Sequence, residues 1–300
     1  MRSWCSSHHA RAEGSMNAQT ATRRHYLMCR PTYFTVAYAI NPWMHPDDEA
    51  VDTERALAQW EALRRTYLDL GHDVSLIEPA PGLPDMVFAA NGAVVVDGLA
   101  FGSRFRHIER LPEAVRYLEW FKAHGVEHGV RDAYLPLGIA EGEGDFLTTS
   151  TRILAGTGFR TEPGAHRELE EYVDREVVSL TLVDPRLYHL DTALAVLDEE
   201  TIAYYPAAFA PESQRLLATL YPDAIHASEE DAMVLGLNAV SDGRNVVLPV
   251  QAAGLARQLE ARGFEAVPVD VSEFRKSGGG PKCCTLEIRV GGGPERGSQP

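Results

Sequence analysis

A unit of helix, strand, polar loop and second strand recurs about five times along the chain, at intervals of roughly 40–55 residues. In the first copy, apolar residues at helical spacing end at Gly71, a short strand is expected at 74–77, and a polar loop leads to a second strand at 93–96. Such a unit cannot bury its apolar face alone, so the units must pack around a shared centre. Radial packing would turn the loop after each unit's first strand into one common cavity. An α/β sheet with helices on both faces is the alternative.

The same pattern places the remaining elements. Helices are expected near residues 114–121, 169–173, 216–220 and 255–259, and second strands at 152–155, 193–197, 245–249 and from 282 onwards. A further strand is expected at 33–40, ahead of the first unit. Residues 1–27 lack the apolar content to join a core. We therefore expect an extension over 1–27, a single domain over 28–292 and a tail over 293–300.

Composition narrows the classes of function. The formal net charge of −15 and the lack of a basic patch argue against binding to nucleic acid or to an anionic membrane surface. No apolar run reaches the roughly 18 residues that a membrane span needs. Four cysteines are too few for a disulfide framework in a chain of 300 residues. We expect a cytoplasmic protein whose partner is a small molecule.

Two adjacent cysteines, Cys283 and Cys284, stand at the predicted start of the last strand, after the glycine-rich stretch 277–280. Successive side chains of a strand face opposite sides, so one thiol can face the cavity and the other the core. Only a thiolate is a strong nucleophile, and Lys282 beside the pair would lower the thiol pKa. We assign Cys283 to the cavity as the nucleophile. The alternative is that the thiol serves only as a small buried apolar side chain.

His189, in the segment YHLD, is the natural acid and base partner for such a cysteine. Any histidine can be an ordinary surface residue, but this one lies in the loop of the third unit, between two predicted strands. Asp191 follows two residues later and would lie on the same side of an extended segment. Asp191 is therefore expected to orient the imidazole ring or to bind substrate.

The loop EGEGD, from Glu141 to Asp145, is acidic and contains glycines that let a ligand approach the backbone. A cation such as guanidinium is best held by a bidentate carboxylate. Calcium binding is the alternative, but the regular ligand spacing of a calcium loop is missing. No Cys and His spacing indicates zinc either. We expect neither a metal nor an organic cofactor.

Two further segments supply polar residues. The segment PDMVFAANG contributes Asp85 and Asn91, and AINPWM contributes Asn41. Each segment alone would be read as a turn. Arg104 and Arg160 are candidates to hold a substrate carboxylate through a bidentate pair, although surface arginines are common.

Taken together, KCCTL, YHLD, EGEGD and PDMVF resemble the motifs of the guanidino-group-modifying enzyme superfamily, over about residues 28–290. The resemblance implies a five-bladed α/β propeller, the pentein fold, with repeated helix-and-strand units around a central active site. In this superfamily a cysteine on the last strand attacks the guanidinium carbon, a histidine shuttles protons and acidic residues hold the guanidinium. Cys283, His189 and Glu141 match these catalytic positions.

Within the superfamily, the segments INPWM, PDMVF followed by AN, and YYPAAF look most like those of arginine dihydrolases. Dimethylargininases and arginine deiminases carry acidic residues, in a pattern like FVED, where this chain reads FAANG. Glu143 departs from the dihydrolase pattern, so either Glu141 or Glu143 can be the functional carboxylate.

A dihydrolase must keep the ureido intermediate and attack it again. A carboxamide such as that of Asn91 can donate to the urea oxygen, whereas a carboxylate cannot. The sequence thus predicts conversion of arginine to ornithine, ammonia and carbon dioxide. Dimethylargininase, arginine deiminase and amidinotransferase activities, and a non-catalytic arginine sensor, are the alternatives.

Overall fold

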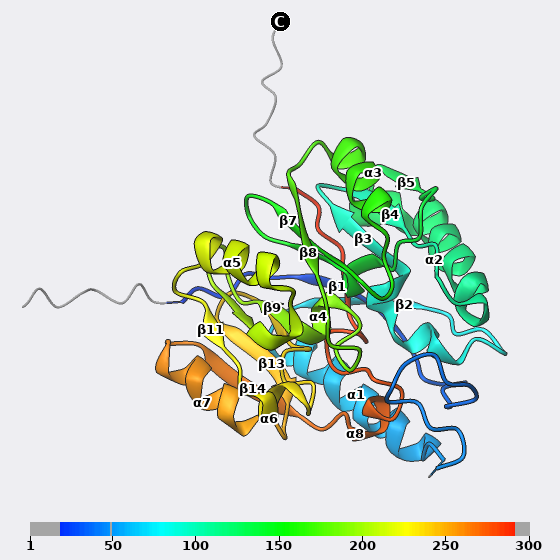
Figure 1. Cartoon of the computed structure of the whole chain (residues 1–300). Coiled ribbons are helices and arrows are strands. Elements are labelled where there is room, and N and C mark those ends of the chain that lie inside the picture. The colour runs from blue at the N-terminus through cyan, green and yellow to red at the C-terminus, as the bar shows by residue number, and fades with distance from the viewer. Residues whose placement is uncertain (1–18, 49, 292–300) are drawn as a thin grey trace, which may run out of the picture.

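The computed structural model describes residues 19–48 and 50–291, which form a mixed α/β fold with five three-stranded sheets (Figure 1). Every sheet has the same internal order. The first strand pairs antiparallel with the middle strand, and the middle strand pairs parallel with the third. A helix connects the middle strand to the third, because parallel neighbours need a crossover connection.

The bounds of the elements follow this order. The first strands are β3 (Ala93–Val96), β6 (Phe146–Thr148), β9 (Leu194–Val196), β12 (Val240–Ser241) and β15 (Leu286–Glu287). The middle strands are β4 (Leu99–Gly102), β7 (Ile153–Thr157), β10 (Ile202–Tyr204), β13 (Asn245–Pro249) and β1 (His25–Cys29). The third strands are β5 (Asp132–Tyr134), β8 (Val177–Thr181), β11 (Ile225–His226), β14 (Glu265–Val269) and β2 (Asp73–Ile77).

The helices that connect middle and third strands are α2 (Leu111–His124), α3 (Pro163–Val173), α5 (Pro211–Leu220), α7 (Ala253–Ala261) and α1 (Thr53–Asp69). Three short helices lie in other loops: α4 (Leu190–Ala193), α6 (Glu229–Ala232) and α8 (Ser272–Arg275). The six single 3₁₀ turns are η1 (Pro84–Val87), η2 (Ala89–Gly92), η3 (Ile108–Arg110), η4 (Gly125–His128), η5 (Gly142–Gly144) and η6 (Pro206–Ala208). In the described part of the chain, none of these helices is long and apolar enough to cross a membrane.

Local sequence explains α1 well. Asp52 caps its first turn by accepting from the backbone N–H of Arg55 at 3.0 Å. Trp60 and Leu63, at helical spacing, are fully buried. Gly71, just beyond the helix, adopts φ 87°, a left-handed conformation that glycine takes without steric cost. The predicted stop at this glycine is confirmed.

The two ends of the described chain meet in one sheet, where β15 pairs with β1 and β1 pairs with β2. Two expectations about this region are wrong. Residues 33–40 form no strand. The strand of this region is β1, which starts at residue 25 and not at 33, because the run from Tyr26 to Cys29 pairs with β15 on one side and β2 on the other. Tyr26 and Leu27 are 1% and 0% exposed, so the packed fold begins before residue 28. Residues 1–18 of the expected extension and the whole of the expected tail (293–300) lie outside the described residues.

The repeat has more strands than the sequence indicates. Each unit was expected to hold two strands, but each sheet has three. Most of the missed strands are only two to four residues long, as are β5, β6, β10 and β12. Runs this short carry too few residues to show a period of two.

Candidate active site

Five loops, each directly before the first strand of a different sheet, carry polar side chains that lie close together in space. The residues are Asn91 before β3, Glu141 before β6, His189 before β9, Asn238 before β12 and Cys283 before β15. All five are nearly or fully inaccessible to solvent. Because the loops occupy equivalent places in the five sheets, the repeat itself assembles the site.

Cys283 lies in the turn before β15 and not on the strand itself, and its side chain is 2% exposed. Its Sγ donates to Asp191 Oδ2 at 3.3 Å and accepts from Asn238 Nδ2 at 3.1 Å. Asn238 Oδ1 also accepts from the backbone N–H of Cys283 at 3.0 Å. The side chain of Asn238 therefore holds both the backbone and the thiol of Cys283. Cys283 lines a small cavity, whereas Cys284 is fully buried and is not part of the cavity wall.

The resting thiol is neutral. Burial raises the pKa of Cys283 well above its usual range, and the neighbouring Asp191 raises it further. Lys282, which was expected to lower this pKa, does not offset these two effects. Its ammonium group donates to the Glu143 carboxylate and to the Thr285 carbonyl oxygen. Activation of the nucleophile must therefore come from another charge.

His189 pairs with Glu141. Its Nε2 lies 2.7 Å from Glu141 Oε2, and Arg160 Nη1 donates to the same oxygen at 3.0 Å. Burial opposes ionisation of Glu141, but Arg160 and His189 outweigh it and hold the pKa of this carboxyl well below its usual range. Glu141 is thus held as a carboxylate, and its hydrogen bond with Nε2 orients the imidazole ring.

Asp191 lies on α4, next to the nucleophile. Its Oδ2 accepts from the Cys283 thiol, while Oδ1 is buried and has no hydrogen-bond partner among the described residues. Burial raises the pKa of Asp191 to about 6, although His189 and Lys282 pull it down. A buried acceptor without a donor is costly, so this oxygen is suited to a donor supplied by a ligand.

The other carboxylates of the EGEGD loop have different partners. Asp145 accepts from the backbone N–H groups of Leu190 and Thr161, both at 3.1 Å, and so ties its loop to the one that bears His189. Glu143 pairs with Lys282 and Arg289 and accepts from the backbone N–H of Glu287 at 3.0 Å. Of the two candidates, Glu141 is therefore the one in contact with His189.

The carboxamide of Asn91 is held in one orientation. Arg110, buried against Glu113, donates from Nη1 to Asn91 Oδ1 at 2.9 Å. Since a guanidinium has no acceptor, the oxygen of the carboxamide must face it and the NH₂ group must point the other way. Nδ2 is directed at the Glu141 carbonyl oxygen, at 3.4 Å. A Cβ placed on Gly144 would lie 2.3 Å from this nitrogen and 3.2 Å from the ring of His189, so the amide lies beside the histidine.

Two of the other predicted residues line the same small cavity as Cys283. Asp85 accepts from the Tyr38 hydroxyl at 2.7 Å and from Ser277 Oγ at 3.3 Å. Asn41 donates to the Ser277 carbonyl oxygen at 3.0 Å and to the Tyr188 hydroxyl at 3.3 Å.

The two predicted arginines lie in different places. Arg160 lines the cavity, and its second nitrogen donates to the Ile40 carbonyl oxygen at 2.8 Å. Arg104 is exposed, donates to the Pro136 carbonyl oxygen at 2.9 Å and is not part of the cavity wall. The structure therefore does not bring Arg104 to the site.

Sequence reasoning missed Asn238 and Arg110. Asn238 ends the segment EEDAMVLGLN, the loop of the fourth unit, and this was the unit whose loop had been given no functional residue. Because each of the other four loops supplies a polar side chain to the site, the repeat itself predicts one from this loop as well. Arg110 offered no such signal, because it sits at the entry to α2 and reaches the site only through folding. In the described part of the chain, no group of three or more His, Cys, Asp or Glu is arranged to hold a metal.

Comparison with known proteins agrees with this geometry. A family model described as N,N dimethylarginine dimethylhydrolase, eukaryotic, matches residues 30–290. An N(G),N(G)-dimethylarginine dimethylaminohydrolase of Mycobacterium tuberculosis is 54% identical over 278 residues, which is 92% of this chain and 89% of the relative.

Arginine dihydrolases are similar as well. The bifunctional arginine dihydrolase/ornithine cyclodeaminase ArgZ of Synechocystis is 37% identical over 266 residues, which is 87% of this chain but 37% of the longer relative. The crystal structure of its N-terminal domain, bound to substrate, superposes with a TM-score of 0.82 at 35% identity and covers 88% of this chain and 98% of that domain. The resemblance to guanidino-group-modifying enzymes is confirmed. The chain belongs to the dimethylarginine dimethylhydrolase family and is an amidinohydrolase that acts on guanidino groups.

Proposed function

We propose that this amidinohydrolase is an arginine dihydrolase, which takes arginine and two water molecules to ornithine, two ammonia and carbon dioxide. The observation that carries the proposal is the fixed carboxamide of Asn91, whose oxygen is held by Arg110 and whose NH₂ group faces the His189 side of the site. We further propose that the five sheets are the blades of a five-bladed α/β propeller. Their common strand order and the pairing of β15 with β1 support that arrangement.

Binding of the guanidinium activates the nucleophile. The free Oδ1 of Asp191 is the acceptor offered to the guanidinium N–H groups. Arrival of a cation next to Cys283 counters the burial and the Asp191 charge that keep its thiol protonated. The thiolate is then formed only when substrate is present, and its proton passes to His189. Arg160 and Asn41, on the cavity wall, are the proposed contacts for the rest of the substrate.

In the first hydrolysis the Cys283 sulfur forms a bond to the guanidinium carbon. One C–N bond breaks, and the departing nitrogen leaves as ammonia with a proton from the imidazolium of His189, which Glu141 stabilises. The neutral imidazole then takes a proton from water, and the resulting hydroxide attacks the carbon. The C–S bond breaks to leave the ureido compound and a free thiolate.

The second hydrolysis repeats these steps on the ureido carbon. It yields an S-carbamoyl intermediate with loss of the second ammonia, and water then gives a carbamate that breaks down to ornithine and carbon dioxide. The ureido oxygen is an acceptor, and the NH₂ group of Asn91, which is turned away from Arg110, is the donor that we propose for it. A carboxylate at this position would repel the oxygen and favour early release of citrulline.

Dimethylargininase activity is the second candidate, and the name of the 54% identical relative favours it. The same thiol and imidazole chemistry would release dimethylamine and citrulline. The two functions differ in products, so the test is direct. The purified chain is incubated separately with arginine, citrulline and asymmetric dimethylarginine, and the products are analysed by mass spectrometry. Ornithine from both arginine and citrulline supports the dihydrolase; citrulline as the end product, with dimethylarginine the best substrate, would replace it with the dimethylargininase.

A further inference from the structure

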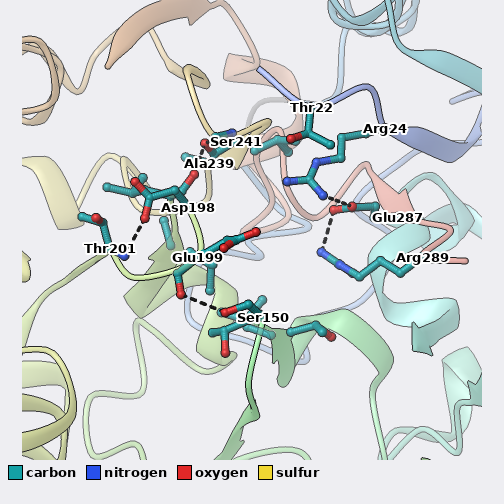
Figure 2. A pocket seen from close by; sticks show the side chains of 18 of the residues that line it. Thr22, Arg24, Ser150, Asp198, Glu199, Thr201, Ala239, Ser241, Glu287 and Arg289 are labelled. Atoms are coloured by element: carbon teal, nitrogen blue, oxygen red, sulfur yellow. Dashed lines mark hydrogen bonds and ion pairs between the residues drawn. The ribbon is translucent and has the colours of Figure 1, made fainter. Parts of the chain in front are cut away.

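A second, larger cavity has a volume of about 1160 Å³ (Figure 2). Lys282 lines this larger cavity, whereas Cys283, the next residue, lines the small catalytic one. Its wall includes residues of β1, β6, β9, β12 and β15, which belong to four of the five sheets, since β1 and β15 share one sheet. Its volume lies just above the usual range of roughly 300–1,000 Å³ for small-molecule sites.

The floor of this cavity is a chain of ion pairs. Glu143 pairs with Lys282 and Arg289, Arg289 pairs with Glu287 at 2.6 Å, and Arg24 approaches Glu287 at 3.4 Å. Three cations meet two carboxylates, so the floor carries one positive charge in excess, within a chain whose formal net charge is −15. The excess belongs to Arg24, whose only carboxylate contact among the described residues is this long one.

Polar atoms in the same wall lack partners. Among the residues that the structure describes, Arg24 Nε, the Tyr26 hydroxyl and Thr148 Oγ1 are buried and make no hydrogen bond. Tyr26 is 1% exposed and stands opposite Glu287 in the register of β1 and β15, beside the ion pairs. These three atoms have almost no accessible surface, so they lie behind the surface of the wall and do not face the open cavity. Contact with a ligand therefore falls to the more exposed charged groups, such as the guanidinium of Arg24, whose side chain is 30% exposed.

The opposite wall is acidic. Asp198, Glu199 and Glu200 form the turn between β9 and β10, and all three line the cavity. Figure 2 shows Asp198 and Glu199 facing the cavity from one side and Arg24, Glu287 and Arg289 from the other. Oδ1 of Asp198 caps this turn by accepting from the backbone N–H groups of Glu200 and Thr201, while Oδ2 is left for another donor.

We propose that this cavity is a second, non-catalytic site for a basic amino acid. The fork of Arg24 donors takes the α-carboxylate, and the Asp198 side takes the cationic end of the side chain. A plain anion such as phosphate does not fit, because five carboxylates border the same space. The ligand class includes the substrate and the product of the proposed reaction. The biological role of the second site therefore rests on the proposed function, but its existence does not.

The test is calorimetric titration of L-arginine into the inactive Cys283→Ser protein and into variants made on that background. We expect two molecules bound per chain. Arg24→Gln should abolish one of them, and Asp198→Asn, which keeps the turn cap, should weaken the same one at least tenfold. Arg23→Gln is the matched control, since this exposed arginine at the rim pairs with Asp73 and should leave both molecules bound. In the enzyme that retains Cys283, Arg24→Gln should keep kcat/KM within twofold.

Asp191→Ala separates the two sites, because it removes the proposed guanidinium acceptor of the catalytic cavity. A single bound arginine that Asp191→Ala abolishes and Arg24→Gln keeps would overturn the second site. Two bound molecules that persist in Arg24→Gln and Asp198→Asn would overturn it as well. A single bound arginine that Arg24→Gln abolishes and Asp191→Ala keeps would uphold the second site and count against the proposed function instead.

Discussion

Asn91→Asp should turn a two-step enzyme into one that stops at citrulline. In the variant, one carboxylate oxygen keeps the contact with Arg110, now as an ion pair at the 2.9 Å separation seen for Asn91. The other oxygen replaces Nδ2 and faces the Glu141 carbonyl oxygen, 3.4 Å away, with no proton to share. The first hydrolysis should survive, because a carboxylate is compatible with a guanidinium.

The second hydrolysis should become slower. The ureido oxygen loses a donor and meets a buried acceptor, a mismatch of about 1–3 kcal/mol. By transition-state arithmetic this slows the second hydrolysis by roughly 5–150-fold, enough for citrulline to leave first. The assay is the ratio of citrulline to ornithine formed from arginine under single-turnover and steady-state conditions.

Asn245→Asp is the matched control. It places a new carboxylate against Asp242, 2.7 Å from the original amide nitrogen, in a sheet away from the reaction. It should lower stability and leave the product ratio unchanged. The reasoning about Asn91 is refuted if wild type makes ornithine and Asn91→Asp makes it in the same ratio. Wild type that releases only citrulline refutes the dihydrolase assignment itself.

Four other outcomes are expected. Cys283→Ser should abolish turnover and Cys284→Ser should retain most of it, as kcat measured on both will show, because only Cys283 lines the cavity. Activity should survive dialysis against EDTA, since every proposed step uses side chains; loss that a divalent ion restores would contradict this. Burial raises the pKa of Asp191 to about 6 and its ionised form is the one that binds guanidinium, so kcat/KM should rise with pH through about 6, and Asp191→Asn should flatten that limb. Glu143→Gln should lower the free energy of unfolding by about 3 kcal/mol, because it leaves Lys282 without its buried partner. The same variant should lower kcat more than KM. A loss of stability with unchanged kcat would show that Glu143 does not help to position Cys283.

The sequence predicted much of the repeat, because the helices are long and amphipathic. Residues such as Trp60 and Leu63 reveal a buried face without any knowledge of the partner. Short strands such as β5, β6, β10 and β12 could not be predicted, because they are defined by pairing with a neighbouring strand. The expected strand at 33–40 shows the converse: an apolar run with suitable composition finds no partner strand, and β1 forms from a shorter run that does.

The candidate site shows the same division. Cys283, His189 and Glu141 stand out by residue type and by their place in the repeat. The orientation of Asn91 could not be predicted, because it depends on Arg110, a residue that comes from another element and contacts it only after folding. The direction of the Cys283 pKa was also beyond the sequence. Lys282 is adjacent along the chain, but its ammonium group forms an ion pair with Glu143.

The ion pairs around Glu143 also bear on the route by which small molecules leave. Lys282 and Arg289 pair with Glu143 and line the larger cavity, while Cys283, next to Lys282 in the chain, lines the small one. Ammonia released at Cys283 could enter the larger cavity past this cluster only by breaking its ion pairs. We therefore expect ammonia to leave by the side from which the amino acid enters, so that a bound amino acid delays its escape.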